Sequence, residues 1–274
     1  MEQKTSRHIR AMTECSIMIA LSTVLSILKL VEMPYGGSVT VASMLPIVIA
    51  VYRHGTLWGI VTAIVNGGIQ LLLGLNNLSY FTTWQSIVAI ILLDYIIAFG
   101  VFALSGVFKK VEKRQSYAML YGTLLASLLR YLCHVISGAT VWAGLSIPTE
   151  AALLYSLSYN ATYMLPETIV LTVVCAYIAG VIDFRAKIPT RVKNTAMSKG
   201  AIYSTLVAGL LLMITVIVDV AALFPHLQDP KTGEFVFTYI GEANFILIGI
   251  VSSVGILGAA ALFTVSRLIK KPAV

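Results

Sequence analysis

The stretch that decides the fold is Leu128-Leu-Arg-Tyr-Leu-Cys-His-Val-Ile-Ser-Gly-Ala-Thr-Val-Trp142, an apolar segment interrupted by four special residues. Arg130, His134, Gly138 and Trp142 recur every four residues, and side chains four apart on an α-helix lie above one another. A cation, an imidazole and an indole in one column are costly in lipid unless they face protein or a cavity. The column therefore predicts one wall of an intramembrane site.

The composition indicates a membrane protein. The chain of 274 residues is 58% hydrophobic and 11% charged, whereas a soluble domain carries about 25% charged residues. Its mean hydropathy is +0.89, so most of the chain is expected to lie in lipid. The net charge of +7 does not indicate nucleic acid, because the basic residues form short clusters between apolar runs, where they act as topology signals.

Eight apolar stretches are long enough, or nearly so, to cross about 30 Å of hydrocarbon. They are 12–31, 39–53, 55–74, 81–108, 117–142, 151–182, 200–224 and 238–266. The second is short and the sixth is long, so we expect the second to be partly re-entrant and the sixth to be tilted, or kinked near Pro166. The predicted fold class is an all-α integral membrane protein, with a six-helix bundle and two additional C-terminal transmembrane helices.

Polar composition divides the chain into three predicted parts. These are a six-helix membrane domain over 1–183, a basic linker over 184–199 and a two-helix appendage over 200–274. If the N-terminus is cytoplasmic, 16 of the 19 Lys and Arg residues lie on the cytoplasmic side, as the positive-inside rule requires. We therefore expect a multi-pass protein of the cell membrane with both termini in the cytoplasm.

Asp94 and Tyr95 lie in the middle of the fourth apolar stretch. A carboxylate at that depth requires a positively charged partner. Two interpretations stay open: Asp94 pairs with Arg130, or Asp94 neutralises a cationic ligand. The two states could alternate as the site fills.

The sixth stretch carries Tyr155, Tyr159 and Tyr163 at intervals of four, with Asn160 on the neighbouring angle. The tyrosines form either an aromatic belt at the outer interface or the wall of a site. The amide of Asn160 must find donors and acceptors inside the membrane. Glu167 follows Pro166, and we expect it to satisfy backbone groups that the proline frees.

Three weaker features accompany these residues. The loop Pro34–Ser38 contains adjacent glycines, which allow a tight turn or the close approach of a ligand. Trp84 stands where a tryptophan of the interface belt would lie. Ser16 and Ala20 form a small-residue step on the first helix, which allows another helix to approach closely.

Several chemistries are not expected. The chain has no phosphate-binding G-x-x-x-x-G-K-[ST] loop, so we expect it not to hydrolyse ATP itself. It has four histidines with no second one near His134 in sequence, and its three cysteines lie in apolar segments, so no metal site is predicted. An intramembrane enzyme built on Asp94 and His134 would lack a nucleophile, and neither an enzyme nor a cofactor is predicted.

Four blocks together resemble the thiamine-specific substrate-binding subunits of energy-coupling factor transporters. The blocks are 34–46, 93–99, 130–138 and 155–167, and they occur in the family's order within about 10–183. The resemblance implies a six-helix subunit that captures thiamine from outside. It also implies partners: a transmembrane coupling protein and two ATPase subunits. The residues from about 200 onward have no counterpart in the usual six-helix member.

The resemblance also implies the roles of particular residues. By position, the substrate-binding residues are Asp94, Tyr95, His134, Gly138, Trp142, Tyr155 and Asn160. The periphery of the site is Gly37, Ser38, Asn66 and Trp84, and the contact with the coupling protein is Ser16 and Ala20. Some members have tryptophans where this chain has Gly37 and Asn66, so the aromatic enclosure is expected to differ.

The chemistry of the residues agrees with thiamine, a permanently cationic thiazolium joined to an aminopyrimidine. Asp94 balances the charge in a medium of low dielectric constant. Trp142 offers a π face worth about 2 kcal/mol to a desolvated cation, and Asn160 offers a donor and an acceptor to the pyrimidine. Arg130 is expected to order Asp94 or to bond carbonyls. The alternative function is an autonomous secondary transporter of thiamine or a related cationic heterocycle, and a phosphate ester or the free pyrimidine stays open as ligand.

Overall fold

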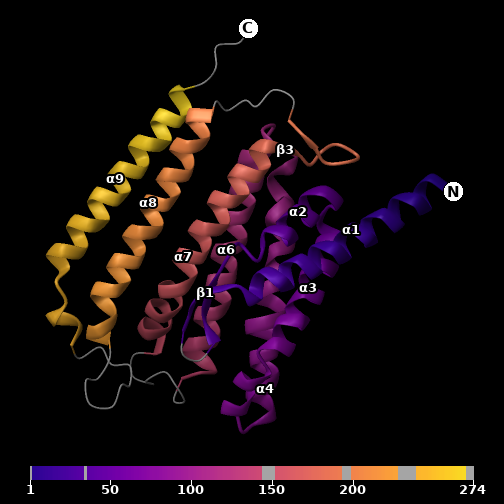
Figure 1. Cartoon of the computed structure of the whole chain (residues 1–274). Coiled ribbons are helices and arrows are strands. Elements are labelled where there is room, and N and C mark those ends of the chain that lie inside the picture. The colour runs from indigo at the N-terminus through magenta and orange to yellow at the C-terminus, as the bar shows by residue number, and fades with distance from the viewer. Residues whose placement is uncertain (1, 34–35, 144–151, 193–198, 228–238, 270–274) are drawn as a thin grey trace. The chain divides into compact units, whose positions relative to one another are not determined.

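The computed structural model describes residues 2–33, 36–143, 152–192, 199–227 and 239–269. The chain forms two compact units, Met1–Val192 and Lys193–Val274, which are described separately here as unit 1 and unit 2. Both are almost entirely helical (Figure 1). The prediction of an all-α membrane fold is confirmed.

Unit 1 contains the long helices of the predicted bundle and two short hairpins. Its α-helices are α1 (Glu2–Ile27), α2 (Leu45–His54), α3 (Thr56–Leu73), α4 (Trp84–Ile90), α5 (Ala98–Gly100), α6 (Gln115–Thr140) and α7 (Ala152–Val181). Tighter or wider helical segments are η2 (Leu75–Tyr80), η3 (Ile91–Ile97) and η4 (Val101–Lys109). The strands are β1 (Lys29–Glu32), β2 (Ser38–Thr40), β3 (Ile182–Asp183) and β4 (Thr190–Arg191).

Seven described helical segments are long and apolar enough to cross a membrane. They are Thr5–Ile27, Thr56–Leu73, Trp84–Lys109, Gln115–Thr140, Ala152–Val181, Tyr203–Leu223 and Phe245–Ser266. The third runs continuously through α4, η3, α5 and η4. Seven of the eight predicted stretches therefore overlap a spanning segment, and the remaining one overlaps α2.

The short helix α2 forms the centre of unit 1. It has ten residues, which at 1.5 Å per residue is about half the thickness of the hydrocarbon layer. Pro46 occupies its first turn, where a missing N–H costs nothing. Gly55 ends it with a φ of 87°, a left-handed conformation that favours glycine. All residues from Leu45 to Tyr52 are buried, and α2 packs against α1, α3 and η4.

The first predicted stretch, 12–31, differs from the structure at both ends. Helix α1 begins at Glu2 and ends at Ile27, and the next residues form β1 instead of a further helical turn. β1 pairs antiparallel with β2, with Lys29 opposite Thr40 and Glu32 opposite Ser38. The four residues Lys29–Glu32 are too few to show a periodicity that would distinguish a last helical turn from an edge strand. The hairpin places the residues after Tyr35 beside α7.

Unit 2 is a helical hairpin of α8 (Lys199–Leu223) and α9 (Phe245–Leu268), connected partly through η6 (Phe224–Leu227) and η7 (Ile240–Glu242). In Figure 1 the two helices, orange and yellow, run side by side in opposite directions. Hydroxyl groups join them: Ser204 Oγ donates to the Leu262 carbonyl at 2.6 Å, and Ser252 Oγ donates to Asp219 at 2.5 Å. The carboxylate of Asp219 is thus hydrogen-bonded within the hairpin.

The close packing of α6 on η4 predicts a strong effect of Gly122→Ala. A Cβ atom at Gly122 would lie 1.8 Å from the backbone oxygen of Ser105, which cannot move without separating the two helices. We expect a loss of about 1–3 kcal/mol in the free energy of unfolding, measured by equilibrium unfolding in detergent micelles. Gly68→Ala in α3 is the control, since its Cβ would meet nothing within 4 Å. Equal effects of the two substitutions would contradict this account of the packing.

Candidate functional site: a polar cavity in unit 1

A cavity of about 600 Å³ lies in unit 1, bounded by η3, α6, α7, the end of α3 and the β1–β2 hairpin. The structure brings all seven predicted substrate-binding residues and two of the predicted peripheral residues to its wall. They are Asp94, Tyr95, His134, Gly138, Trp142, Tyr155 and Asn160, with Gly37 and Ser38. Residues as far apart in sequence as Gly37 and Asn160 thus meet around one space.

A change of helical type places Asp94 and Tyr95 at the cavity. The segment Ile91–Ile97 is π-helical, and such widened turns are frequent at functional sites. Both side chains line the cavity although they are adjacent in sequence. The hydroxyl of Tyr95 accepts a hydrogen bond from Nδ2 of Asn77 at 3.3 Å. Asn77 was not singled out in the sequence, because an amide in a loop is common.

Asp94 is held by three donors from α6 and the turn after it. Its Oδ1 lies 2.9 Å from Nδ1 of His134, and its Oδ2 accepts from Ser137 Oγ at 2.7 Å and from Trp142 Nε1 at 3.2 Å. A carboxylate only accepts hydrogen bonds, so Nδ1 of His134 carries the proton. Nε2 of the same ring is then the acceptor, and it is buried without a partner among the described residues. Ser137 was missed in the sequence because serine is unremarkable on an apolar helix.

Arg130 pairs with Glu167 rather than with Asp94, contrary to the first interpretation of Asp94. Nη1 of Arg130 lies 3.6 Å from Oε2 of Glu167, and the guanidinium stands 4.6 Å from the ring centroid of Phe99. The expectation that Arg130 orders Asp94 was wrong. Sequence could not decide between the two carboxylates, since they lie on different helices.

We expected Glu167 to satisfy the backbone groups that Pro166 frees, but it contacts the side chains of Thr40 and Arg130 instead. It is 5% exposed, and Oε1 accepts a hydrogen bond from Thr40 Oγ1 at 3.0 Å. The hydroxyl of Ser43 lies 2.8 Å from Thr40 Oγ1, and Ser22 of α1 donates to the Ser43 carbonyl at 2.7 Å. A chain of polar contacts therefore joins Glu167, the partner of Arg130, to α1.

Three tyrosines of α7 face the cavity instead of forming a belt. Tyr155 and Tyr159 stack at 6.0 Å with an interplanar angle of 11°, and Tyr163 meets Tyr159 edge-on at 6.0 Å. All three line the cavity. The hydroxyl of Tyr163 donates to Oδ1 of Asn160 at 2.6 Å.

Asn160 is a buried positioning amide. Its Nδ2 donates to the carbonyl of His134 at 3.3 Å and to the carbonyl and hydroxyl oxygens of Ser156 at 2.9 and 3.1 Å. Together with the Tyr163 contact, these bonds use both ends of the amide. Asn160 thereby holds α7 against α6 at the level of the imidazole.

Trp142 lies beyond the end of α6, which stops at Thr140, so the predicted four-residue column is helical only as far as Gly138. The backbone N–H of Trp142 still bonds the Ser137 carbonyl, at 3.2 Å. Phe81 packs edge-on against the indole at 4.7 Å. The turn therefore keeps Trp142 over the cavity with a different geometry from the one predicted.

Gly37 allows the β1–β2 loop to reach α7. A Cβ atom there would lie 2.7 Å from the ring of Tyr163. Gly36 has a φ of 104°, which glycine adopts without strain. Pro34 and Tyr35 of the predicted loop lie outside the described residues.

Two predicted peripheral residues do not line the cavity. Asn66 is 0% exposed in the core, where its Nδ2 lies 3.8 Å from Sδ of Met44. Trp84 is 70% exposed on the outer surface of α4. Ser16 and Ala20 lie on the exposed side of α1, opposite the buried Ala11 and Cys15.

The charges around the cavity leave one carboxylate without a cation. Lys29 pairs with Glu32 at the rim, and Arg130 pairs with Glu167. Among the described lining residues, Asp94 is the remaining carboxylate, and its partners are the imidazole, a hydroxyl and an indole. With a neutral His134 the lining carries one uncompensated negative charge.

The arrangement differs from a nucleophile relay. In such a relay the serine bonds the histidine and the carboxylate orients that histidine. Here Ser137 bonds the carboxylate itself. In the described part of the chain, no group of three His, Cys, Asp or Glu residues is placed to hold a metal ion.

The sequence is similar to those of known proteins. A family model described as thiamine transporter protein matches residues 12–186. The chain belongs to the thiamine transporter family. The thiamine transporter ThiT of Bacillus subtilis (strain 168) is 34% identical over 180 residues, which is 62% of this chain and 90% of that protein. The family predicted from the four sequence blocks is thus confirmed.

A solved structure of a family protein supports the fold. ThiT from Listeria monocytogenes matches with a TM-score of 0.51 and 22% identity, over 63% of this chain and 94% of that one. The family match ends at residue 186. Unit 2 therefore lies outside the residues that match the thiamine transporter family.

The buried pair beneath the cavity predicts that Glu167→Gln strongly destabilises the protein. The amide keeps the shape and still accepts from Thr40, but Arg130 loses its counter-charge. Breaking a buried ion pair costs about 3–5 kcal/mol, to be measured by equilibrium unfolding in detergent. Glu32→Gln is the matched control, because its pair with Lys29 is exposed and worth about 0–1 kcal/mol. A loss no larger than that of the control would show that the inner pair contributes little.

Proposed function

We propose that this protein captures thiamine from outside the cell and delivers it through an energy-coupling factor module. The observation that carries the proposal is the uncompensated carboxylate of Asp94 in a cavity whose wall includes an indole and several tyrosine rings. Thiamine brings one permanent positive charge, which matches the one negative charge of the lining. A charge pair in such a medium is far stronger than in water, because the effective dielectric constant is lower.

The donors around Asp94 prepare it for a cation. Hydrogen bonds from His134, Ser137 and Trp142 hold the carboxylate and fix its direction. The indole and the stacked tyrosines supply π faces for the thiazolium and the pyrimidine. The site therefore offers both charge balance and ring contacts.

The second ring of thiamine matches the remaining polar groups. Nε2 of His134 accepts a hydrogen bond and has no partner among the described residues, so it suits the exocyclic amine of the pyrimidine. Asn160 and Tyr163 bond each other in the wall of the cavity, and a ligand edge would exchange with that bond. Arg130 is balanced by Glu167 and leaves no spare cation for a phosphate ester.

The proposal places the protein in the plasma membrane with both termini in the cytoplasm. The basic residues at the ends of α2, η4 and α7 then lie inside, and the β1–β2 hairpin over the cavity lies outside. The exposed Ser16 and Ala20 on α1 contact the coupling protein, which works with two ATPase subunits. The chain is a carrier subunit and not an enzyme.

A secondary transporter is the alternative function, because unit 2 adds two spanning helices to the family's six. The hairpin carries the paired carboxylate Asp219, which an ion-coupled carrier could use. That function needs no partner proteins, and this difference separates the two proposals.

Asp94→Asn tests the charge match. Losing one partner of a buried charge pair costs about 2–5 kcal/mol, so thiamine affinity should fall by roughly 30-fold or more. The uncharged aminopyrimidine fragment should lose far less, since it has no positive charge to balance. Calorimetric titration of the purified protein with both ligands measures the two losses. Equal losses would mean that Asp94 has only a structural role.

Reconstitution into liposomes tests the energy source. The chain alone should bind labelled thiamine without accumulating it, under an ion gradient or with internal ATP. Addition of the coupling protein and the two ATPases should give ATP-dependent accumulation. Accumulation by the chain alone under an ion gradient would support the secondary transporter and overturn the coupled mechanism.

A further inference from the structure

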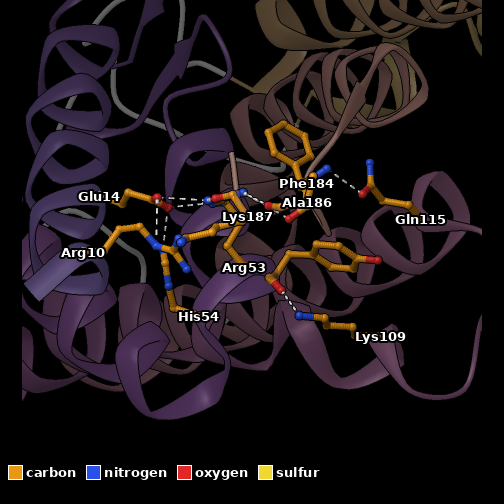
Figure 2. A network of polar contacts seen from close by, with 10 residues as sticks. Arg10, Glu14, Arg53, His54, Lys109, Gln115, Phe184, Ala186 and Lys187 are labelled. Atoms are coloured by element: carbon orange, nitrogen blue, oxygen red, sulfur yellow. Dashed lines mark hydrogen bonds and ion pairs between the residues drawn. The ribbon is translucent and has the colours of Figure 1, made fainter. Parts of the chain in front are cut away.

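A second polar cluster of unit 1 shares no residue with the cavity lining (Figure 2). It lies where α2 ends and α7 passes into the β3–β4 hairpin. We call it the Arg53 cluster, which consists of Glu14, Arg53, His54 and the carbonyl groups of Phe184, Ala186 and Lys187. These groups come from α1, from α2 and from the segment after α7.

Arg53 uses all five of its N–H donors in this cluster. Nε and Nη2 donate to the two carboxylate oxygens of Glu14 at 2.7 and 2.9 Å. Nη1 donates to the carbonyls of Phe184 and Ala186 at 3.1 and 3.3 Å, and Nη2 donates to that of Lys187 at 3.2 Å. The side chain is 6% exposed. A guanidinium has five donors in a rigid planar fork, so this set of bonds fixes one geometry.

Glu14 connects the cluster to α1. Nε2 of His54 lies 2.7 Å from its Oε2, and Nε of Arg10, one turn earlier on α1, lies 3.8 Å from its Oε1. The bidentate contact with Arg53 constrains rotation as well as distance. The cluster therefore fixes the angle of α1 about its own axis.

That angle decides which way the small-residue face of α1 points. Ala11 and Cys15 are buried against the bundle, while Ser16 and Ala20 lie on the exposed side. Glu14 is within one turn of Ser16 and within two turns of Ala20. Rotation of α1 at Glu14 would displace the exposed face directly.

We propose that Arg53 is a positioning residue for transport: it holds α1 through Glu14 so that the exposed Ser16–Ala20 face engages the coupling protein. This inference rests on the proposed function, because it requires a partner at α1. It assigns to Arg53 a role in coupling and none in thiamine binding.

The neighbouring contacts show why the effect should be specific to α1. The segment after α7 is also held by Gln115, which donates to the Ile182 carbonyl and accepts from the Phe184 N–H. Arg185 donates to the Tyr52 hydroxyl and to the Lys113 carbonyl. None of these contacts reaches α1, so the segment keeps its place when Arg53 is removed, while α1 loses the bidentate contact between Arg53 and Glu14.

The experiment compares Arg53→Gln, Arg53→Lys and Glu14→Gln in the full chain. Each should leave thiamine affinity within about twofold of the unchanged protein and should lower partner-dependent uptake by about tenfold or more, since a buried charge pair is broken. Arg53→Lys should not restore uptake, because one ammonium group cannot replace a five-donor fork. Calorimetric titration and ATP-dependent uptake in liposomes provide the two readouts.

Arg185→Gln is the matched control at the same end of the bundle. It removes a guanidinium that ties the same segment but does not touch α1, so uptake should stay close to that of the unchanged protein. Equal loss of uptake in Arg185→Gln and Arg53→Gln, or full uptake in the Arg53 variants, would overturn the inference. A parallel loss of thiamine affinity would also overturn it. Absence of partner-dependent uptake in the unchanged protein would instead refute the proposed function.

Discussion

An ionised carboxylate inside a membrane must be surrounded by donors, and in this protein that constraint organises the cavity. Asp94 receives hydrogen bonds from His134, Ser137 and Trp142, all on α6 or the turn after it. The π-helical turn at Ile91–Ile97 brings Asp94 to them. With a neutral imidazole, these three donors stabilise the negative charge without cancelling it. That arrangement supports the proposed capture of a cationic ligand.

The remaining buried charges of unit 1 are compensated within the protein. Arg130 and Glu167 form a pair beneath the cavity, and Arg53 and Glu14 form another at the basic end of the bundle. The first pair is linked through Thr40 and Ser43 to α1, and the second acts on α1 directly. The middle of α1, at Glu14, and its C-terminal part, at Ser22, are thus connected to buried polar groups, which agrees with the proposed role of α1 in contacting a partner.

The sequence predicted which residues line the cavity better than it predicted how their charges pair. The four-residue spacing of Arg130, His134 and Gly138 required a helix, and polar groups in lipid required a shared cavity, so the site wall could be inferred. The partner of Arg130 could not, because Asp94 and Glu167 both lie one helix away and only tertiary packing chooses between them.

The hydropathy of the sequence also did not predict some of the local structure. Lys29–Glu32 form a strand because they pair with β2, a contact that depends on residues six to eleven positions later in the chain. Asn66 and Trp84 matched the family by position, yet one is buried in the core and the other is exposed. Alignment places the backbone of such residues and leaves the direction of their side chains undetermined.

The most direct measurement is the affinity of the unchanged protein for thiamine and for an analogue of the same shape with an uncharged ring in place of the thiazolium. Both ligands make the same ring contacts, and only thiamine carries the positive charge that balances the carboxylate of Asp94. The account predicts that the neutral analogue binds roughly 30-fold or more weakly. Equal affinities would show that ring contacts alone select the ligand, and that the buried carboxylate does not hold its charge.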